Sequence, residues 1–157
     1  MRFKVLKMKI EVDMSGKIED LRQNTIIALS NSEQYSVLLP KKIKQELFQD
    51  FKSKFRQLRF RIFAICLYYC LEGYLKNKEI VIIDVEYDGK DAEIKTYLLP
   101  LIKKKYENFD KNVIRFSHLG KKSKVHEIAI LTNRDVLRPN RILTKQNITE
   151  KLRGDSG

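Results

Sequence analysis

Two aspartates stand where this sequence is best suited to do chemistry. Asp13 closes a segment of alternating apolar and polar residues, and Asp84 directly follows four consecutive apolar residues, 80–83. If the two segments are neighbouring strands, their ends place the two carboxylates a few ångströms apart. Two adjacent carboxylates repel each other and are stabilised by a shared divalent cation, and their hard oxygen atoms suit Mg²⁺ or Mn²⁺. The sequence therefore predicts a metal site at these strand ends.

Each aspartate also has a plainer interpretation. Asp13 shares its segment with Lys9 and Glu11, which fits a solvated strand face, and Asp84 fits a cap at a turn. Burying a carboxylate behind four apolar residues is nevertheless costly unless a partner compensates it. Taken together, the two positions favour the metal site.

The two histidines, His118 and His126, are the other candidate ligands. A lone histidine is more often a structural residue than a ligand. His126 has Glu127 as its neighbour, and it follows a basic run whose ammonium groups are natural contacts for phosphate, namely Lys121, Lys122 and Lys124. We therefore keep His126 as a candidate site residue.

Hydrophobic periodicity predicts the elements that would position these residues. Period-two and β-branched segments predict strands, and apolar residues at intervals of three and four predict helices. The predicted strands are 7–14, 24–29, 35–39, 79–85 and 112–116, and the predicted helices are 43–73, 92–106 and 122–132. The fourth strand is apolar enough to be buried on both faces. We expect an α/β fold with a five-stranded mixed sheet, formed by a three-strand antiparallel meander and then alternating helices and strands, with helices on its faces.

This element order, with an acid on the first and the fourth strand, resembles the ribonuclease H-like nuclease fold over residues 5–132. The resemblance implies that Asp13 and Asp84 bind the catalytic Mg²⁺ or Mn²⁺, and that a further ligand lies on the last helix, where His126 and Glu127 stand. The sequence around His126 is similar to Holliday-junction resolvases. The short core and the Asp-Met-Ser-Gly motif look most like archaeal single-strand 3′–5′ exonucleases of this fold.

The chain departs from that family at one position. Ribonuclease H proper carries a glutamate on its first helix, at a spacing where this chain has Arg61 and Ile62. The resemblance thus implies either a reduced set of carboxylates or a contribution from Asp88 to the metal site. This departure argues against activity on the RNA strand of a hybrid more than against the fold.

The charge of the chain indicates its partner. Its 157 residues contain 32 Lys and Arg against 20 Asp and Glu, for a net charge of +12 and a pI near 9.7. A charge of this size attracts polyanions. The predicted long helix would place Lys52, Arg56 and Arg59 on one face, without acidic residues among them. We expect a nucleic acid as partner, DNA rather than RNA, bound by these residues and by the basic run before His126.

Composition also excludes several classes of protein. A hydrophobic content of 43% supports one packed domain, residues 1–134, followed by a loosely packed basic tail, residues 135–157. The most apolar stretch, 62–71, is too short to cross a membrane, and the charged N-terminal residues do not fit a signal peptide. Cys66 and Cys70 lie on the apolar stripe, so we expect them in the core. These features favour a cytoplasmic protein without a membrane partner and leave a homo-oligomer open.

The sequence therefore favours a metal-dependent nuclease that hydrolyses phosphodiester bonds in single-stranded or structured DNA. Two alternatives stay open at this point. One is a non-catalytic nucleic-acid-binding module on the same scaffold, and the other is a structural subunit that binds a protein through the long helix. Binding of a divalent cation separates the nuclease from both.

Overall fold

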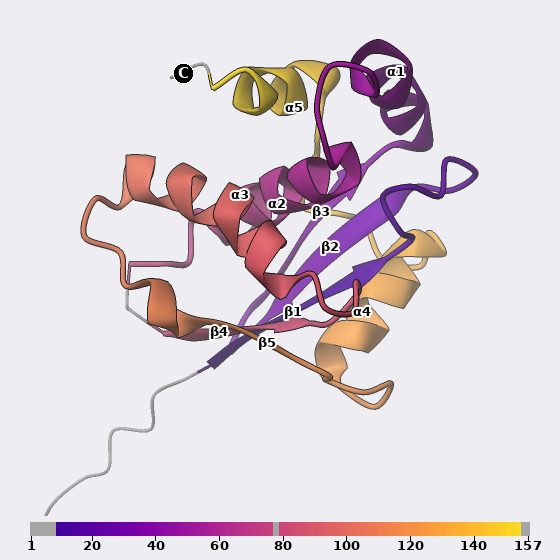
Figure 1. Cartoon of the computed structure of the whole chain (residues 1–157). Helices are drawn as coiled ribbons and strands as arrows, with labels where there is room; N and C mark the ends of the chain where they lie inside the picture. Colours follow the sequence, from indigo (N-terminus) through magenta and orange to yellow (C-terminus); the bar gives the residue numbers. More distant parts are fainter. Residues whose placement is uncertain (1–8, 77–78, 155–157) are drawn as a thin grey trace, which may run out of the picture.

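The computed structural model of the chain describes residues 9–76 and 79–154 (Figure 1). Its strands are β1 (Lys9–Ser15), β2 (Thr25–Ser30), β3 (Gln34–Leu39), β4 (Ile80–Asp84), β5 (Ile114–Ser117) and β6 (Arg141–Ile142). Its helices are α1 (Lys41–Phe51), α2 (Leu58–Leu71), α3 (Asp91–Lys105), α4 (Lys124–Asn133) and α5 (Lys145–Leu152), and a 3₁₀ turn (Lys111–Val113) precedes β5. Lys7 and Met8, predicted in the first strand, lie outside the described residues.

The strands form one mixed sheet in the order β5-β4-β1-β2-β3-β6. β1, β2 and β3 are antiparallel neighbours, whereas β4 runs parallel to β1, and β5 runs parallel to β4. The predicted α/β class and the antiparallel meander are confirmed. The expected count of five strands is wrong, because β6 adds a sixth beside β3. Two residues are too few for a period to reveal a strand.

The helices cover both faces of this sheet. α2 and α3 lie on one face and α4 lies on the other (Figure 1). The alternation of β1 decides which side chains meet each layer: Ile10, Val12 and Met14 join the main core under α2, whereas Asp13 faces the opposite side. A smaller cluster lies under α4, where Ala28 of β2 packs against the helix. Asp13 is therefore directed toward α4.

Helix α2 is the centre of the main core. Apolar side chains surround it on all sides, as expected for a helix enclosed by a sheet and by other helices. Cys66 and Cys70 are fully buried and free, which confirms that they are core residues. Burial raises the pKa of the Cys66 thiol to about 12, so the thiol stays protonated and unreactive.

The prediction of one long helix over 43–73 is wrong. α1 ends at Phe51, and Gln57 adopts a left-handed conformation with φ of 55° just before α2 begins. The apolar pattern continues across this break because Phe55 packs edge-on against Phe51, at 5.8 Å between ring centroids. The hydrophobic periodicity therefore continues through the segment between α1 and α2, although this segment is not helical. As a result, Lys52, Arg56 and Arg59 do not share one helix face.

Strand β4 and the C-terminal segment also differ from expectation. β4 is not buried on both faces, because Ile82 and Asp84 are only half-buried on the side away from α2. The segment after residue 134 is not loosely packed throughout, since Leu143 and Ile148 belong to the main core. Leu143 also donates its backbone N–H to the carbonyl of Leu38 on β3, at 2.8 Å. Within residues 9–76 and 79–154, no helix has both the length and the apolar composition needed to cross a bilayer.

Candidate metal centre

Three carboxylates gather at the ends of two neighbouring strands. β1 and β4 run parallel with Val12 opposite Ile83, so the next residues, Asp13 and Asp84, lie side by side. Glu86 follows β4 by two residues. One potential ligand oxygen from each of the three lies within 4.8 Å of the other two. The structure thus brings Asp13 and Asp84 together, as their places at two strand ends predicted, and we call these three residues the acidic site.

Glu86 is the member that sequence reasoning missed. Residues two apart in an extended chain point to the same side, so the spacing of Asp84 and Glu86 was the signal that could have found it. Asp88, which the resemblance suggested as the additional acid, is exposed. It is not part of the group of close ligand atoms found among the described residues.

Glu86 is fixed in place through the residue that follows it. The Tyr87 ring is buried and meets Phe60 and Phe63 of α2 edge-on, at centroid distances of 5.1 and 5.6 Å. Its hydroxyl donates to Glu19 Oε1 at 2.8 Å. The chain is therefore anchored in the core directly after Glu86, which limits how far this carboxylate can withdraw from the other two.

The turn after β1 fixes the other side of the acidic site. Gly16 has φ of +82°, and a Cβ atom there would lie 2.1 Å from the carbonyl oxygen of Asn24, so only glycine fits. The buried ammonium of Lys44 holds the following loop by donating to the carbonyls of Lys17 and Asp20, at 3.1 and 2.6 Å. Burial lowers the pKa of Lys44 to about 8. The loop after Asp13 is thus tied to α1.

Helix α4 supplies a direct partner for Asp13. His126 Nδ1 lies 2.8 Å from Asp13 Oδ2, and the other oxygen of this buried carboxylate accepts the N–H of Met14 at 2.8 Å. Ser123 caps α4 by accepting the backbone N–H of His126. At the far end of α4, Asn133 Nδ2 donates to Ser15 Oγ at 2.9 Å. The helix is therefore fastened to β1 at both ends.

The segment before α4 contacts the second aspartate. The backbone N–H of Leu119 donates to Asp84 Oδ1 at 2.8 Å. Asp84 therefore has one oxygen held by the backbone before α4, and it offers a ligand oxygen within 4.8 Å of one from Glu86. His126 is not among the mutually close ligand atoms of the acidic site. The structure places it as the partner of Asp13.

The acidic site is electrostatically strained without a cation. Burial, hydrogen bonding with Asp13 and the charges of Asp13 and Asp84 together raise the pKa of Glu86 to about 9. At neutral pH Glu86 therefore keeps its proton. A cation coordinated at about 2.1–2.5 Å sets its ligand oxygens up to about 4–5 Å apart, which matches the spacing here. By donor chemistry and by spacing, the acidic site fits a hard divalent cation.

The remaining residues predicted for the site lie outside the acidic site. Glu127 is exposed on α4, and His118 is exposed before it. The three lysines of the basic run are exposed at the start of α4 and in the turn before it: Lys121, Lys122 and Lys124. Lys52 and Arg56 are exposed, whereas Arg59 pairs with Glu19 at 3.1 Å and stacks on the Phe60 ring. Arg59 is thus partly engaged within the protein.

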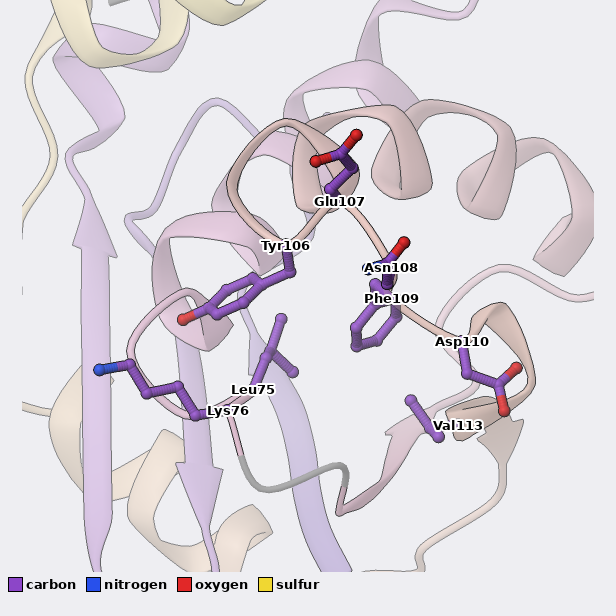
Figure 2. A pocket seen from close by; sticks show the side chains of 8 residues that line it. All are labelled: Leu75, Lys76, Tyr106, Glu107, Asn108, Phe109, Asp110 and Val113. Atoms are coloured by element: carbon purple, nitrogen blue, oxygen red, sulfur yellow. The ribbon is translucent and has the colours of Figure 1, made fainter.

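A small apolar pocket lies at the opposite end of the strands from the acidic site. It measures about 210 Å³ and is lined by the segments that precede β4 and β5. Figure 2 shows Leu75, Tyr106 and Phe109 around it, with the carboxylates of Glu107 and Asp110 directed away. None of its residues belongs to the group of close ligand atoms found among the described residues, and the pocket carries no functional assignment.

Comparisons of the chain with models of protein families, with curated proteins and with solved structures found no significant match. The function of the chain is therefore inferred from the arrangement of its own side chains.

Proposed function

We propose that this protein is a divalent-metal-dependent nuclease of the ribonuclease H-like fold, acting on phosphodiester bonds of single-stranded or structured DNA. The observation that carries the proposal is the acidic site: three carboxylates from two parallel strand ends within 4.8 Å, with His126 on Asp13. The net charge of +12 agrees with a polyanionic substrate.

The element order supports the proposal. The resemblance rests on the order of the elements. That order is an antiparallel meander, helices, a strand that ends in Asp84, and then a helix, a strand and a helix. Asp13 lies on β1, Asp84 on the adjacent β4, and His126 on the helix packed against β1. These are the three places at which the resemblance expects functional residues. Neither α1 nor α2 contributes a carboxylate to the acidic site, whereas Glu86 does.

Asp13, Asp84 and Glu86 would hold the Mg²⁺ or Mn²⁺. A divalent cation there supplies a water of lowered pKa and neutralises the charge that develops on the phosphoryl oxygens. The residues of the chain have separate tasks. Asp13 and Asp84 each keep one oxygen fixed by a backbone N–H, from Met14 and Leu119 respectively. Their remaining oxygens are therefore oriented before any ligand arrives.

His126 has two tasks in this proposal. With Nδ1 as the donor to Asp13, a neutral imidazole carries its lone pair on Nε2. The Nδ1 contact orients Asp13, and Nε2 accepts the proton that the attacking water loses. The lysines before α4 lie next to this ring in the sequence and draw the phosphate backbone to the same place.

One alternative from the sequence loses its structural basis. A structural subunit that binds a protein through the long Phe-rich helix needs an exposed apolar helix face. Phe60 and Phe63 of α2 are instead buried in the core of this chain. The non-catalytic nucleic-acid-binding module differs from the nuclease only in metal binding and cleavage, and a single substitution at Asp84 separates them.

The test compares Asp84→Asn with the matched control Asp88→Asn, which removes an exposed carboxylate four residues away. We expect Asp84→Asn to lower divalent-cation affinity in calorimetry by at least about a hundred-fold, since even partners of metal ligands cost 10–100-fold. Cleavage of a labelled single-stranded oligonucleotide with Mg²⁺ or Mn²⁺ should be lost, while Asp88→Asn behaves like wild type. Cleavage by Asp84→Asn at the wild-type rate would refute the nuclease. Wild-type protein that binds the oligonucleotide but neither metal would favour the binding module.

A further inference from the structure

A second, polar pocket lies at the other end of α2 from the acidic site. It measures about 630 Å³ and is lined by the C-terminal parts of α2 and α3 together with β6 and α5. Tyr68 and Tyr69 of α2 contribute aromatic rings to it. We call it the α2–α5 pocket. α2 runs away from the acidic site toward this pocket, because Phe60 and Phe63 near its start support Tyr87, next to Glu86.

Positive charge predominates in this pocket. Its lining has two carboxylates, Glu72 and Glu150, against four basic groups, from Lys104, Lys105, Arg141 and Lys151. Glu72 is shared between two of these, with Arg141 Nη1 at 3.3 Å and Lys105 Nζ at 4.0 Å. Among the described residues, Lys104 and Lys151 form no ion pair: Lys104 donates to the Gly154 carbonyl, and Lys151 lies 5.3 Å from the Tyr68 ring centroid. Two ammonium groups therefore remain for an external anion.

Local structure explains only some of the basic side chains in the α2–α5 pocket. Cations in the last turn of a helix are favoured by the helix dipole, which accounts for Lys104 and Lys105 on α3. It does not account for Arg141 and Lys151, which β6 and α5 bring from elsewhere in the chain. Arg141 is held flat over the Tyr69 ring, at 4.7 Å from its centroid. Three separate elements thus converge their cations on one concave surface.

The tyrosines add no charge to the pocket. A phenol is neutral at physiological pH, and burial raises the pKa of Tyr68 and of Tyr69 further, to about 12. The Tyr69 hydroxyl donates to the Asn147 carbonyl at 2.8 Å, which ties α5 to α2 and shapes the pocket. Both rings are almost fully buried and carry cations above them, so the pocket presents charge and hydrogen-bond donors beside its aromatic wall.

We propose that the α2–α5 pocket binds backbone phosphates of a polynucleotide, as an anchoring site remote from the acidic site. This inference rests on the proposed function for the identity of the polyanion. Arginine offers phosphate a fork of donors, and lysine offers a mobile charge, so the site reads the backbone without reading sequence. A nucleic-acid strand that is bound in the α2–α5 pocket stays attached to the protein whether or not its other end occupies the acidic site.

The test uses the full chain in EDTA, so that no cleavage occurs. The affinity for a single-stranded oligonucleotide is measured by fluorescence anisotropy at several salt concentrations. Each lost phosphate contact on a single strand reduces the slope of log K against log salt by about 0.7, so Lys104→Gln/Lys151→Gln should lower it by about 1.4. The control Lys103→Gln/Lys95→Gln removes two lysines of α3 that do not line the pocket, and it should keep the larger slope. Melting curves check that both variants fold.

Two competition arms identify the anion. Unlabelled oligonucleotide should displace the probe far better than inorganic pyrophosphate or a poly-glutamate peptide at equal charge. Equal competition by pyrophosphate would assign the pocket to a free phosphate compound, and equal competition by the peptide would assign it to an acidic protein. Either result, or an unchanged slope for the double variant, overturns the proposal. Calorimetric Mg²⁺ and Mn²⁺ titrations of the same variants report on the acidic site separately, so failure of one proposal leaves the other measurable.

Discussion

The two ends of α2 support two regions of opposite charge. Near its start, the helix braces Tyr87 and so holds the acidic site together at two strand ends. Near its finish, Tyr68 and Tyr69 form one wall of the α2–α5 pocket, where long basic side chains meet. The first region concentrates negative charge on short side chains, and the second spreads positive charge over long ones.

The difference shows how the backbone determines what each region can bind. Asp13 and Asp84 lie at the ends of adjacent strands, and Glu86 retains a proton because it is buried beside their two charges. Such a rigid site fits a compact ion of high charge. Lysine stems are flexible and their ammonium groups remain hydrated, so Lys104 and Lys151 can follow an extended polyanion. One region is suited to chemistry, and the other is suited to retention of the substrate.

The sharpest way to separate the two regions is to alter His126 in two ways. His126→Asn keeps a side-chain N–H that can donate to Asp13, whereas His126→Ala removes it. If Nε2 accepts a proton during cleavage, both variants should lose rate by about a hundred-fold or more. Only His126→Ala should also weaken divalent-cation binding, by about 10–100-fold, because Asp13 loses its partner.

Cleavage rates and calorimetry under identical conditions check this expectation, with Glu127→Gln as the control for an exposed neighbour on α4. Oligonucleotide affinity in EDTA should stay at the wild-type value in both His126 variants, since the α2–α5 pocket is untouched. A wild-type cleavage rate for His126→Asn would show that His126 only positions Asp13.

The sequence predicted most of the first region and none of the second. Asp13 and Asp84 could be found because each ends an apolar strand, and strand neighbours follow from short-range patterns. Glu86 was missed because it lies beyond the last residue of its strand, where the apolar pattern has ended. The α2–α5 pocket depends on Arg141 and Lys151, which reach it only because β6 and α5 fold back onto the core. A strand of two residues has no hydrophobic periodicity, so the sequence pattern could not predict this long-range contact.

The break between α1 and α2 was hidden for a different reason. The apolar spacing runs unbroken through Phe51, Phe55 and Leu58, although the chain turns at Gln57. A non-glycine residue with positive φ is uncommon, and no residue type in this segment announces it. Hydrophobic patterning therefore reported which residues enter the core, but not whether one helix carries them.

A substitution on the buried face of α2, in its last turn, tests whether the two regions share more than a core. Cys70→Ala removes a fully buried thiol, and it should lower the free energy of unfolding by about 1–2 kcal/mol through lost packing. Urea denaturation measures this change. Divalent-cation affinity and the salt dependence of oligonucleotide binding should both stay at wild-type values in the folded variant. A change in either would show that α2 couples the acidic site to the α2–α5 pocket.

The last prediction concerns the proton that Glu86 retains. Its pKa lies near 9 in the folded protein against an ordinary value of 4.5. Between these pH values the unfolded chain binds fewer protons than the folded one, so stability falls as pH rises from about 4.5 to about 9. Glu86→Gln removes this dependence while it keeps the size of the side chain. We expect its metal-free melting temperature to exceed that of wild type at pH 8, and the two to converge near pH 5.

The difference at pH 8 should be on the order of ten degrees, because each pKa unit corresponds to about 1.4 kcal/mol and about 1 kcal/mol shifts the melting temperature of a domain of this size by about 2–4 °C. Glu127→Gln, an exposed carboxylate on α4, should show no such divergence. Mg²⁺ should reverse the order at pH 8, since wild type gains a ligand by releasing the proton and the variant does not. Parallel melting curves for wild type and Glu86→Gln across this pH range would mean that Glu86 does not keep its proton. The acidic site would then be less constrained than the contrast with the α2–α5 pocket requires.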